Sequence, residues 1–129
     1  MKIFNEYKVS SWAYFKCRDL KDKGIPDKER YWKLITDNYC AYWYCRNVKD
    51  REEVWSKITN SMWAYLYCKD IKDRKEMREK ITECEYAYWY CRLVKDQKEI
   101  WEKITDSEWA YKYCKNVKDR PEVRKYIKE

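Results

Sequence analysis

A six-residue phrase built around alanine recurs five times in this chain, and it constrains the fold more than any other feature. The five copies are WAYFKC (12–17), CAYWYC (40–45), WAYLYC (63–68), YAYWYC (86–91) and WAYKYC (109–114). Successive copies are 23 residues apart, except that the first interval is 28 because residues 23–27, KGIPD, lengthen the first repeat. A period of this length is typical of solenoids, in which each repeat buries its apolar face only against its neighbours.

The composition favours a helical protein. One glycine and two prolines in 129 residues leave almost none of the turn chemistry that β-hairpins need, which points to the all-α class. Aromatic residues make up 19% of the chain and supply enough apolar area to form a core, although 41% of the residues are charged. The start, MKIFNEYK, lacks the apolar run of a signal peptide, and no stretch is long enough to span a membrane. We therefore expect a soluble protein that does not engage a membrane.

The residues around each alanine have the spacing of one helical face. If the alanine is numbered zero, small or apolar residues fall at 0, +3, +4 and +7, as in Ala87, Tyr90, Cys91 and Val94. Polar residues that can cap the helix start precede three of these segments, at Asp37 and Asn38, Asn60 and Ser61, and Asp106 and Ser107. Lysines stand where each helix ends, at Lys49, Lys72, Lys95 and Lys118. The pattern predicts a first helix of about 12 residues in each repeat.

A second, shorter helix is predicted after each of those lysines. An Asp follows directly and a Glu comes three residues later, which resembles a capping box with Asp as the cap. The pairs are Asp50 with Glu53, Asp73 with Glu76, Asp96 with Glu99, and Asp119 with Glu122. The apolar residues expected inside are Val54 and Ile58, Met77 and Ile81, Ile100 and Ile104, and Val123 and Ile127. In the inserted segment we expect Gly24 to end the longer helix in a left-handed cap and Pro26 with Asp27 to start the next. Pro121 fits the first turn of the last short helix.

The sequence thus predicts one all-α domain, residues 1–129, that forms an α-solenoid of five two-helix repeats with a 23-residue period. The repeats span approximately residues 9–36, 37–59, 60–82, 83–105 and 106–129. A capped helix, a Lys-Asp corner and a short helix entered by DRPEV (119–123) resemble the leucine-rich-variant repeats. The chain is also similar to Tyr/Ala-rich tandem repeats of uncharacterised bacterial and phage proteins. The first resemblance implies an α-helix paired with a short second helix in a right-handed superhelix, and neither assigns a role to any residue.

Cysteine is used as a packing residue in this pattern. Five of the seven cysteines occupy position +4, where a small apolar side chain packs: Cys17, Cys45, Cys68, Cys91 and Cys114. Their spacing and the absence of histidine disfavour a metal site, so we expect neither a metal nor another cofactor. Reduced thiols of this kind indicate a cytoplasmic protein. Cys40 and Cys84 lie outside the pattern and are expected to be exposed.

A stripe of tyrosine and basic residues is the candidate binding surface. Position +1 is tyrosine, position +5 is a basic residue and position +8 is lysine, all on one side of the helix. The stripe comprises Tyr42, Arg46, Lys49, Tyr65, Lys69, Lys72, Tyr88, Arg92, Lys95, Tyr111, Lys115 and Lys118. The net charge of the chain is +7, and the excess positive charge falls in the first helices. In the alternative interpretation the lysines only complement the helix ends and the tyrosines pack into the adjoining repeat.

Positions 0 and +2 carry mostly small or apolar residues and are not part of the tyrosine and basic stripe. Alanine at zero permits close approach of neighbouring helices, because a longer side chain there would hold them apart. Position +2 is apolar in four repeats, at Phe15, Trp43, Leu66 and Trp89, but it is Lys112 in the last. We add Trp43 and Trp89 to the candidate binding surface, because the middle repeats would expose an apolar row that the last repeat lacks.

The residues favour a binding protein over an enzyme. The chain has no histidine to act as a general base and no glycine-rich loop to hold a phosphate. The first hypothesis is a non-catalytic module that engages a protein partner, an acidic one in particular, through the basic, aromatic-rich helical surface. The second is a nucleic-acid-binding protein that uses the same surface. A third is a phage or mobile-element inhibitor of host defence, with anti-CRISPR-like activity.

Overall fold

The structure is a computed structural model that describes residues 6–128, with side chains from residue 8 onward. These residues form ten α-helices and no β-strand, which confirms the all-α class. They divide into two compact units, Met1–Thr59 and Asn60–Glu129, and each is described separately. The boundary between the units coincides with the predicted end of the second repeat. Among the described residues, no helix has both the length and the apolar character needed to cross a bilayer.

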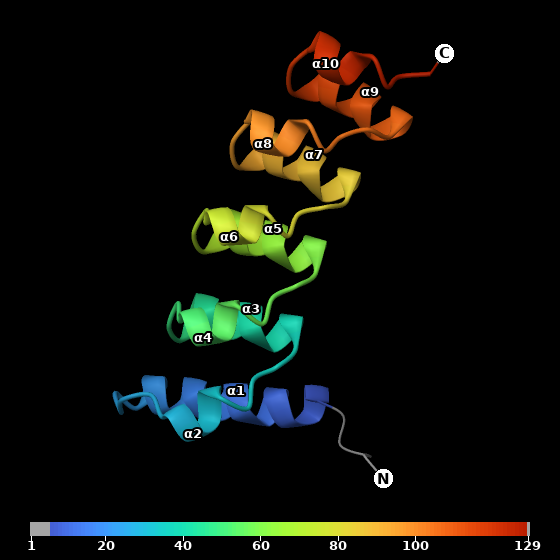
Figure 1. Cartoon of the computed structure of the whole chain (residues 1–129). Helices are drawn as coiled ribbons and strands as arrows, with labels where there is room; N and C mark the ends of the chain where they lie inside the picture. Colours follow the sequence, from blue (N-terminus) through green and yellow to red (C-terminus); the bar gives the residue numbers. More distant parts are fainter. Residues whose placement is uncertain (1–5, 129) are drawn as a thin grey trace. The chain divides into compact units, whose positions relative to one another are not determined.

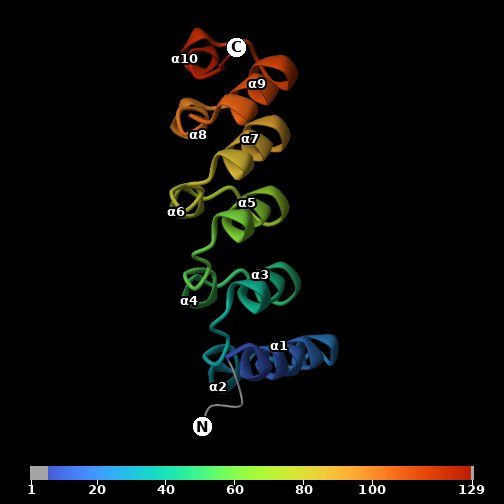
Figure 2. The same cartoon turned by 90° about the vertical axis from the view of Figure 1, so that its right-hand side faces the viewer.

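The first unit contains two pairs, each made of a longer and a shorter helix. Its helices are α1 (Glu6–Asp22), α2 (Glu29–Trp32), α3 (Asn38–Asn47) and α4 (Glu52–Trp55). Helix α1 contacts both α2 and α3, and α3 contacts α4 (Figure 1). The shorter helices lie on one side of this unit and the longer helices on the other (Figure 2).

The second unit repeats the same arrangement three times. Its helices are α5 (Ser61–Asp70), α6 (Lys75–Arg78), α7 (Cys84–Leu93), α8 (Lys98–Trp101), α9 (Ser107–Asn116) and α10 (Pro121–Arg124). Each longer helix contacts the shorter helix that follows it, and α7 contacts both α5 and α9. As in the first unit, the shorter helices share one side (Figure 2). Within this unit, the longer helices that contact each other are therefore consecutive in the sequence.

Four of the predicted helix ends are found in the structure at the predicted residues. The side chains of Asp37, Asn60 and Asp106 accept hydrogen bonds from backbone amides of the helices that they precede. Gly24 has a φ of +71°, which only glycine adopts without strain. The amide of Ile25 donates to the carbonyl of Leu20 at 2.8 Å, and that of Gly24 donates to Lys21 at 2.9 Å. These two bonds form the Schellman motif, which ends α1 as predicted.

The longer helices of repeats two to five are shorter than expected. They have 10 residues each, against the predicted length of about 12. The cause is visible at Val94, whose φ of −113° and ψ of −70° leave the helical geometry at position +7. The amide of Lys95 still donates to the carbonyl of Tyr90 at 3.1 Å, so the last turn closes two residues beyond Leu93. The lysine at +8 therefore lies just outside the helix.

The capping boxes predicted for the shorter helices are wrong. The N-cap is one residue after the Asp, and no side chain caps these helices; the N-caps are Arg51, Arg74, Gln97 and Arg120. Two of the Asp residues instead accept hydrogen bonds from tyrosines on the following longer helix. The hydroxyl of Tyr90 donates to both carboxylate oxygens of Asp73, at 2.9 and 2.8 Å. These carboxylates therefore join consecutive helix pairs.

The inserted segment supplies the same contact in the first unit. Helix α2 begins at Glu29 with Lys28 as its N-cap, so Pro26 and Asp27 precede the helix and do not start it. The Asp27 carboxylate accepts a hydrogen bond from the hydroxyl of Tyr44. Arg51 reaches the same carboxylate, with 3.4 Å between Nη2 and Oδ2. In the first unit the carboxylate that joins consecutive helix pairs therefore belongs to Asp27, which lies within the five inserted residues.

The core follows the repeat pattern. The alanines at position zero have no exposed surface; they are Ala13, Ala41, Ala64, Ala87 and Ala110. The apolar residues predicted for the last four shorter helices are buried from Val54 to Val123, and Ile127 is partly exposed. These helices have four residues each, so the second residue of each predicted pair lies beyond the helix and not inside it: Ile58, Ile81, Ile104 and Ile127. The expectation that Cys40 is exposed is wrong, since it is 2% exposed at position −1, on the flank that packs toward α1. Cys84 is half-buried.

Candidate functional site

The basic residues of the candidate surface all lie in contact with solvent. Those at positions +5 and +8, here called the basic stripe, are Arg46, Lys49, Lys69, Lys72, Arg92, Lys95, Lys115 and Lys118, and each is exposed. Ion pairing within the stripe is sparse. Lys69 lies 3.5 Å from a carboxylate oxygen of its neighbour Asp70, an exposed pair of small energetic weight. The stripe therefore keeps most of its positive charge available to a partner.

The tyrosines at position +1 are placed differently from the basic residues. Tyr42, Tyr65 and Tyr88 are buried, with Tyr42 only 2% and Tyr88 only 1% exposed. Tyr111 in the last repeat is 52% exposed. In the second unit the ring of Tyr88 lies 5.5 Å from that of Trp109 in the next repeat, which accounts for its burial. The buried rings offer no face on which a nucleotide base could stack.

Hydrogen bonds connect these tyrosines to the stripe. Arg92 donates from Nη1 to the hydroxyl of Tyr88 at 2.9 Å, and Asn116 of the next repeat donates to the same oxygen at 2.9 Å. Arg46 makes the equivalent bond to Tyr42 at 3.2 Å. The tyrosine hydroxyl thus holds the arginine of its own helix in place. In these two repeats positions +1 and +5 are therefore in direct contact, and the tyrosine supports the arginine.

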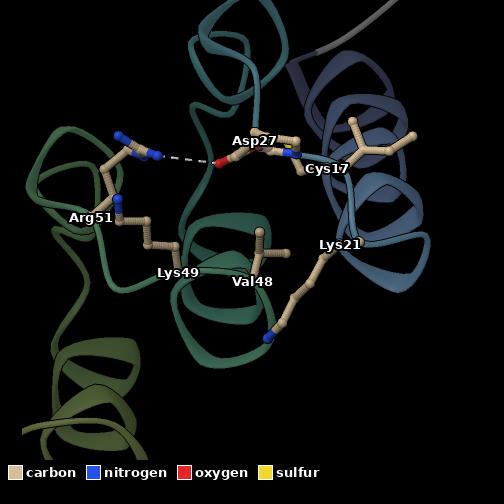
Figure 3. A pocket seen from close by; sticks show the side chains of 9 residues that line it. Cys17, Lys21, Asp27, Val48, Lys49 and Arg51 are labelled. Carbon is tan, nitrogen blue, oxygen red and sulfur yellow. Dashed lines mark hydrogen bonds and ion pairs between the residues drawn. The ribbon is translucent and has the colours of Figure 1, made fainter.

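A pocket of about 540 Å³ contains one stripe residue, Lys49, in the first unit. Figure 3 shows its labelled side chains, which come from α1, the inserted segment and the turn between α3 and α4. The complete lining is Cys17, Lys21, Gly24, Ile25, Pro26, Asp27, Val48, Lys49 and Arg51. Lys21 donates to the carbonyl of Asn47 at 2.6 Å, and Arg51 donates from Nε to the Tyr44 hydroxyl at 2.9 Å. Two of the three cations are therefore committed to structural contacts.

The thiol in this pocket, that of Cys17, has low reactivity at neutral pH. Burial, together with the nearby Asp27 carboxylate, raises the pKa of Cys17 to about 12. At neutral pH the sulfur is therefore a protonated thiol, which is a weak nucleophile and a poor metal ligand. Among the described residues, no group of three or more His, Cys, Asp or Glu side chains is arranged to hold a metal ion.

An apolar groove lies between α1 and α3 in the first unit. We call it the aromatic groove; its lining is Ser11, Tyr14, Phe15 and Arg18 from α1, with Tyr39, Cys40, Trp43 and Asn47 from α3. Its volume is about 370 Å³. Phe15 is 57% exposed and Tyr39 is 46% exposed, while Trp43 is half-buried. Trp89, the other tryptophan of the candidate surface, is half-buried in the second unit.

The predicted binding surface included only Trp43 of the eight residues that line the aromatic groove, and among those it missed are Arg18 and Tyr39. Arg18 occupies position +5 of the first repeat, so the periodicity could have included it in the stripe. Tyr39 occupies position −2, which is Ser, Met or Glu in the other repeats, so no recurring signal marks it. Its exposure is a property of the contact between α1 and α3.

Comparison of the chain with protein-family models, with curated proteins and with solved structures gives no match. Its function is therefore inferred from its own residues.

Proposed function

We propose that the chain is a non-catalytic module that binds an acidic protein partner through the basic stripe. In this proposal the helix pairs continue as one α-solenoid domain of five repeats, along which the stripe recurs once per repeat from the second repeat on. The observation that carries it is the contrast between exposed cations and buried tyrosines at neighbouring positions on the same helices. A surface of exposed lysine and arginine attracts carboxylates.

Nucleic acid is a weaker candidate for the same surface. Binding to single strands combines cationic contacts with aromatic rings on which bases stack. Tyr42, Tyr65 and Tyr88 are buried, so this stacking would have to use other rings. Phosphate contacts alone would remain, and their affinity falls steeply with salt, by about 10³ to 10⁵ between 50 and 200 mM for a protein with many contacts.

Charge reversal within the stripe tests the proposal. The variant Lys69→Glu with Arg92→Glu changes position +5 in two repeats of the second unit. The matched control, Lys75→Glu with Lys98→Glu, makes the same change in net charge at exposed positions that begin α6 and α8. Binding is measured by fluorescence anisotropy with labelled polyglutamate and with labelled single- and double-stranded DNA and RNA.

The proposal predicts that polyglutamate binds the wild-type chain, that the stripe variant loses binding and that the control variant loses much less. Equal loss in both variants would mean that net charge alone governs binding, which contradicts a defined surface. Preferential binding of DNA or RNA over polyglutamate at about 150 mM salt would favour the nucleic-acid candidate instead.

A further inference from the structure

We infer that the aromatic groove receives an apolar side chain of the acidic partner, whose flanking carboxylates contact Arg18 and Arg46. This inference rests on the proposed function and adds a specific point of insertion to it. The groove volume of about 370 Å³ lies at the lower end of the range of about 300 to 1,000 Å³ that is typical of ligand pockets. It suits a single side chain.

The floor of the groove is held rigidly. Tyr14 is buried, and its hydroxyl accepts a hydrogen bond of 2.9 Å from Nδ2 of Asn47. This bond ties α1 to α3 directly beneath the groove. The rings of Tyr14 and Phe15 have centroids 5.2 Å apart. A floor that is already formed lowers the entropic cost of binding.

The walls expose aromatic area that the first unit itself leaves uncovered. Phe15 stands on one side, and Tyr39 stands on the other with its ring 6.3 Å from that of Trp43 in an edge-on contact. Aromatic side chains at the centre of an interface contribute a large share of binding energy, because they bury much area and lose little conformational freedom. The groove therefore offers the type of contact that anchors a peptide.

The cationic side chains at the groove favour an acidic partner. Arg18 is the one charged side chain among the eight that line the groove. The guanidinium of Arg46 lies 5.2 Å from the centroid of the Trp43 ring and places a second cation at the groove wall. Two carboxylates, Asp19 and Asp22, lie with Phe15 and Arg18 in a neighbouring hollow, and a third, Asp37, accepts a hydrogen bond of 3.1 Å from the amide of Cys40. An acidic peptide would therefore run past Arg46, away from those carboxylates.

The equivalent positions of the second unit explain why the groove is assigned to the first. Position −2 is Ser11 and Tyr39 in the first unit, but it is Glu85 and Glu108 on α7 and α9. Both glutamates are exposed, so a carboxylate stands where Tyr39 forms a wall of the groove. Repulsion from these glutamates disfavours an acidic peptide there. The second unit keeps the basic stripe but lacks an apolar wall of the same kind.

Three labelled peptides test the inference by fluorescence anisotropy. The first is an oligoaspartate with a single central phenylalanine, the second is the same oligoaspartate without phenylalanine, and the third is a Gly-Ser peptide with a central phenylalanine. We expect the first to bind at least about tenfold more tightly than either of the others, because burial of one phenylalanine side chain supports a difference of this size.

Two variants locate the binding point. Phe15→Lys introduces the residue type that the last repeat carries at the same position, Lys112, and Phe15 is exposed enough for the fold to tolerate it. Its control is Leu66→Lys, the same change at the same position in the second unit. Both variants add a positive charge, so a purely electrostatic surface would bind the acidic peptides more tightly in each. We expect Phe15→Lys to weaken binding of the phenylalanine-containing oligoaspartate by about tenfold and Leu66→Lys to leave it unchanged or strengthen it.

Tyr39→Glu provides an independent variant, since glutamate occupies this position in two other repeats. We expect the same selective loss, with unchanged helical circular dichroism. Equal affinity for the two oligoaspartates would overturn the groove while leaving the stripe in place. Binding of neither oligoaspartate would refute the proposed function, and the inference with it. Tight binding of oligothymidylate that displaces the phenylalanine-containing peptide would identify the groove as a base-stacking site and overturn the inference.

Discussion

The hydroxyl of Tyr113 donates a hydrogen bond of 2.7 Å to Oδ1 of Asp96, which lies 17 residues earlier in the chain. Arg120 approaches both groups: its Nε donates to the Tyr113 hydroxyl at 2.6 Å and its Nη2 lies 2.9 Å from Oδ2 of Asp96. Tyr113 is fully buried. One helix pair is thus attached to the next by a partly buried polar cluster in addition to apolar packing, and a cluster of this kind fixes the register between repeats.

Tyr113→Phe is expected to lower the free energy of unfolding by about 1.5 kcal/mol. The substitution removes the hydrogen bond to a charged group but leaves the ring in place, and bonds of this type contribute about 1.5 to 3 kcal/mol. Tyr111→Phe is the matched control, because Tyr111 is 52% exposed and should change stability by less than about 0.5 kcal/mol. Urea unfolding followed by circular dichroism measures both. Similar losses in the two variants would contradict the structural role of the Tyr113 hydroxyl.

A double-mutant cycle separates the role of Asp96 in the cluster from the capping role that its sequence position suggests. Asp96→Ala and Tyr113→Phe should couple by about 1 kcal/mol, because the two side chains contact each other. Asp96→Ala combined with Tyr111→Phe should be additive to within about 0.5 kcal/mol. If Asp96 acted as a helix cap alone, both cycles would be additive.

The buried tyrosines should make the protein less stable in alkali. Burial raises the pKa of Tyr113 above its ordinary value, and the hydrogen bond to Asp96 raises it further; Tyr90 is affected in the same way by burial and Asp73. A folded-state pKa above the unfolded value of about 10 gives stability that is fully present below about pH 10 and is lost as the pH rises toward the folded pKa. Burial also raises the pKa of Cys68 and Cys91 to about 12, which adds a loss of the same sign that begins near pH 9.

Urea unfolding at about pH 8 and about pH 11 measures this loss. Tyr113→Phe removes one titrating group, so the variant should lose less stability between these two pH values than the wild type does. An equal loss in both would show that Tyr113 does not contribute to the alkaline transition.

Residues that repeat with the helical period were predictable from sequence, and residues whose environment depends on a neighbouring repeat were not. Ala87 is small and recurs at a fixed interval, so its burial follows from the pattern alone. Gly24 is the one glycine in the chain and follows the last turn of α1, where a left-handed residue is needed. Both predictions depend only on local geometry and were confirmed.

Asp96 and Tyr39 show why the rest was not predictable. The Asp-x-x-Glu spacing at Asp96 matches a capping box, but its partner Tyr113 lies in the next helix pair and leaves no mark nearby in the sequence. Tyr88 stands beside Ala87 on the helix, and the periodicity of one helix does not reveal that Trp109 covers it. Tyr39 forms a groove wall only because α3 packs beside α1. Each of these features depends on contacts between repeats.

Enlarging the alanine at the contact between longer helices should destabilise the second unit. Ala87 on α7 has no exposed surface, and α7 contacts both α5 and α9. Ala87→Leu inserts extra volume into a packed contact and should cost about 1 to 3 kcal/mol. Glu85→Leu, at an exposed position of the same helix, controls for the change in composition. Thermal unfolding of the two variants measures the difference, and an unchanged melting temperature in Ala87→Leu would contradict the close packing of these helices.

The cysteines should react with iodoacetamide in an order set by their burial. Cys68 and Cys91 are each 4% exposed, and burial raises the pKa of both thiols to about 12, so few of their thiolates form at neutral pH. Cys84 and Cys114 are half-buried and present more surface to the reagent. Mass spectrometry of peptides after brief alkylation of the native chain should find modification first at Cys84 and Cys114, and at Cys68 and Cys91 only after denaturant is added. Early modification of Cys91 in the native chain would show that the contact between α7 and its neighbours opens readily, which would contradict the burial of Cys91 in the core.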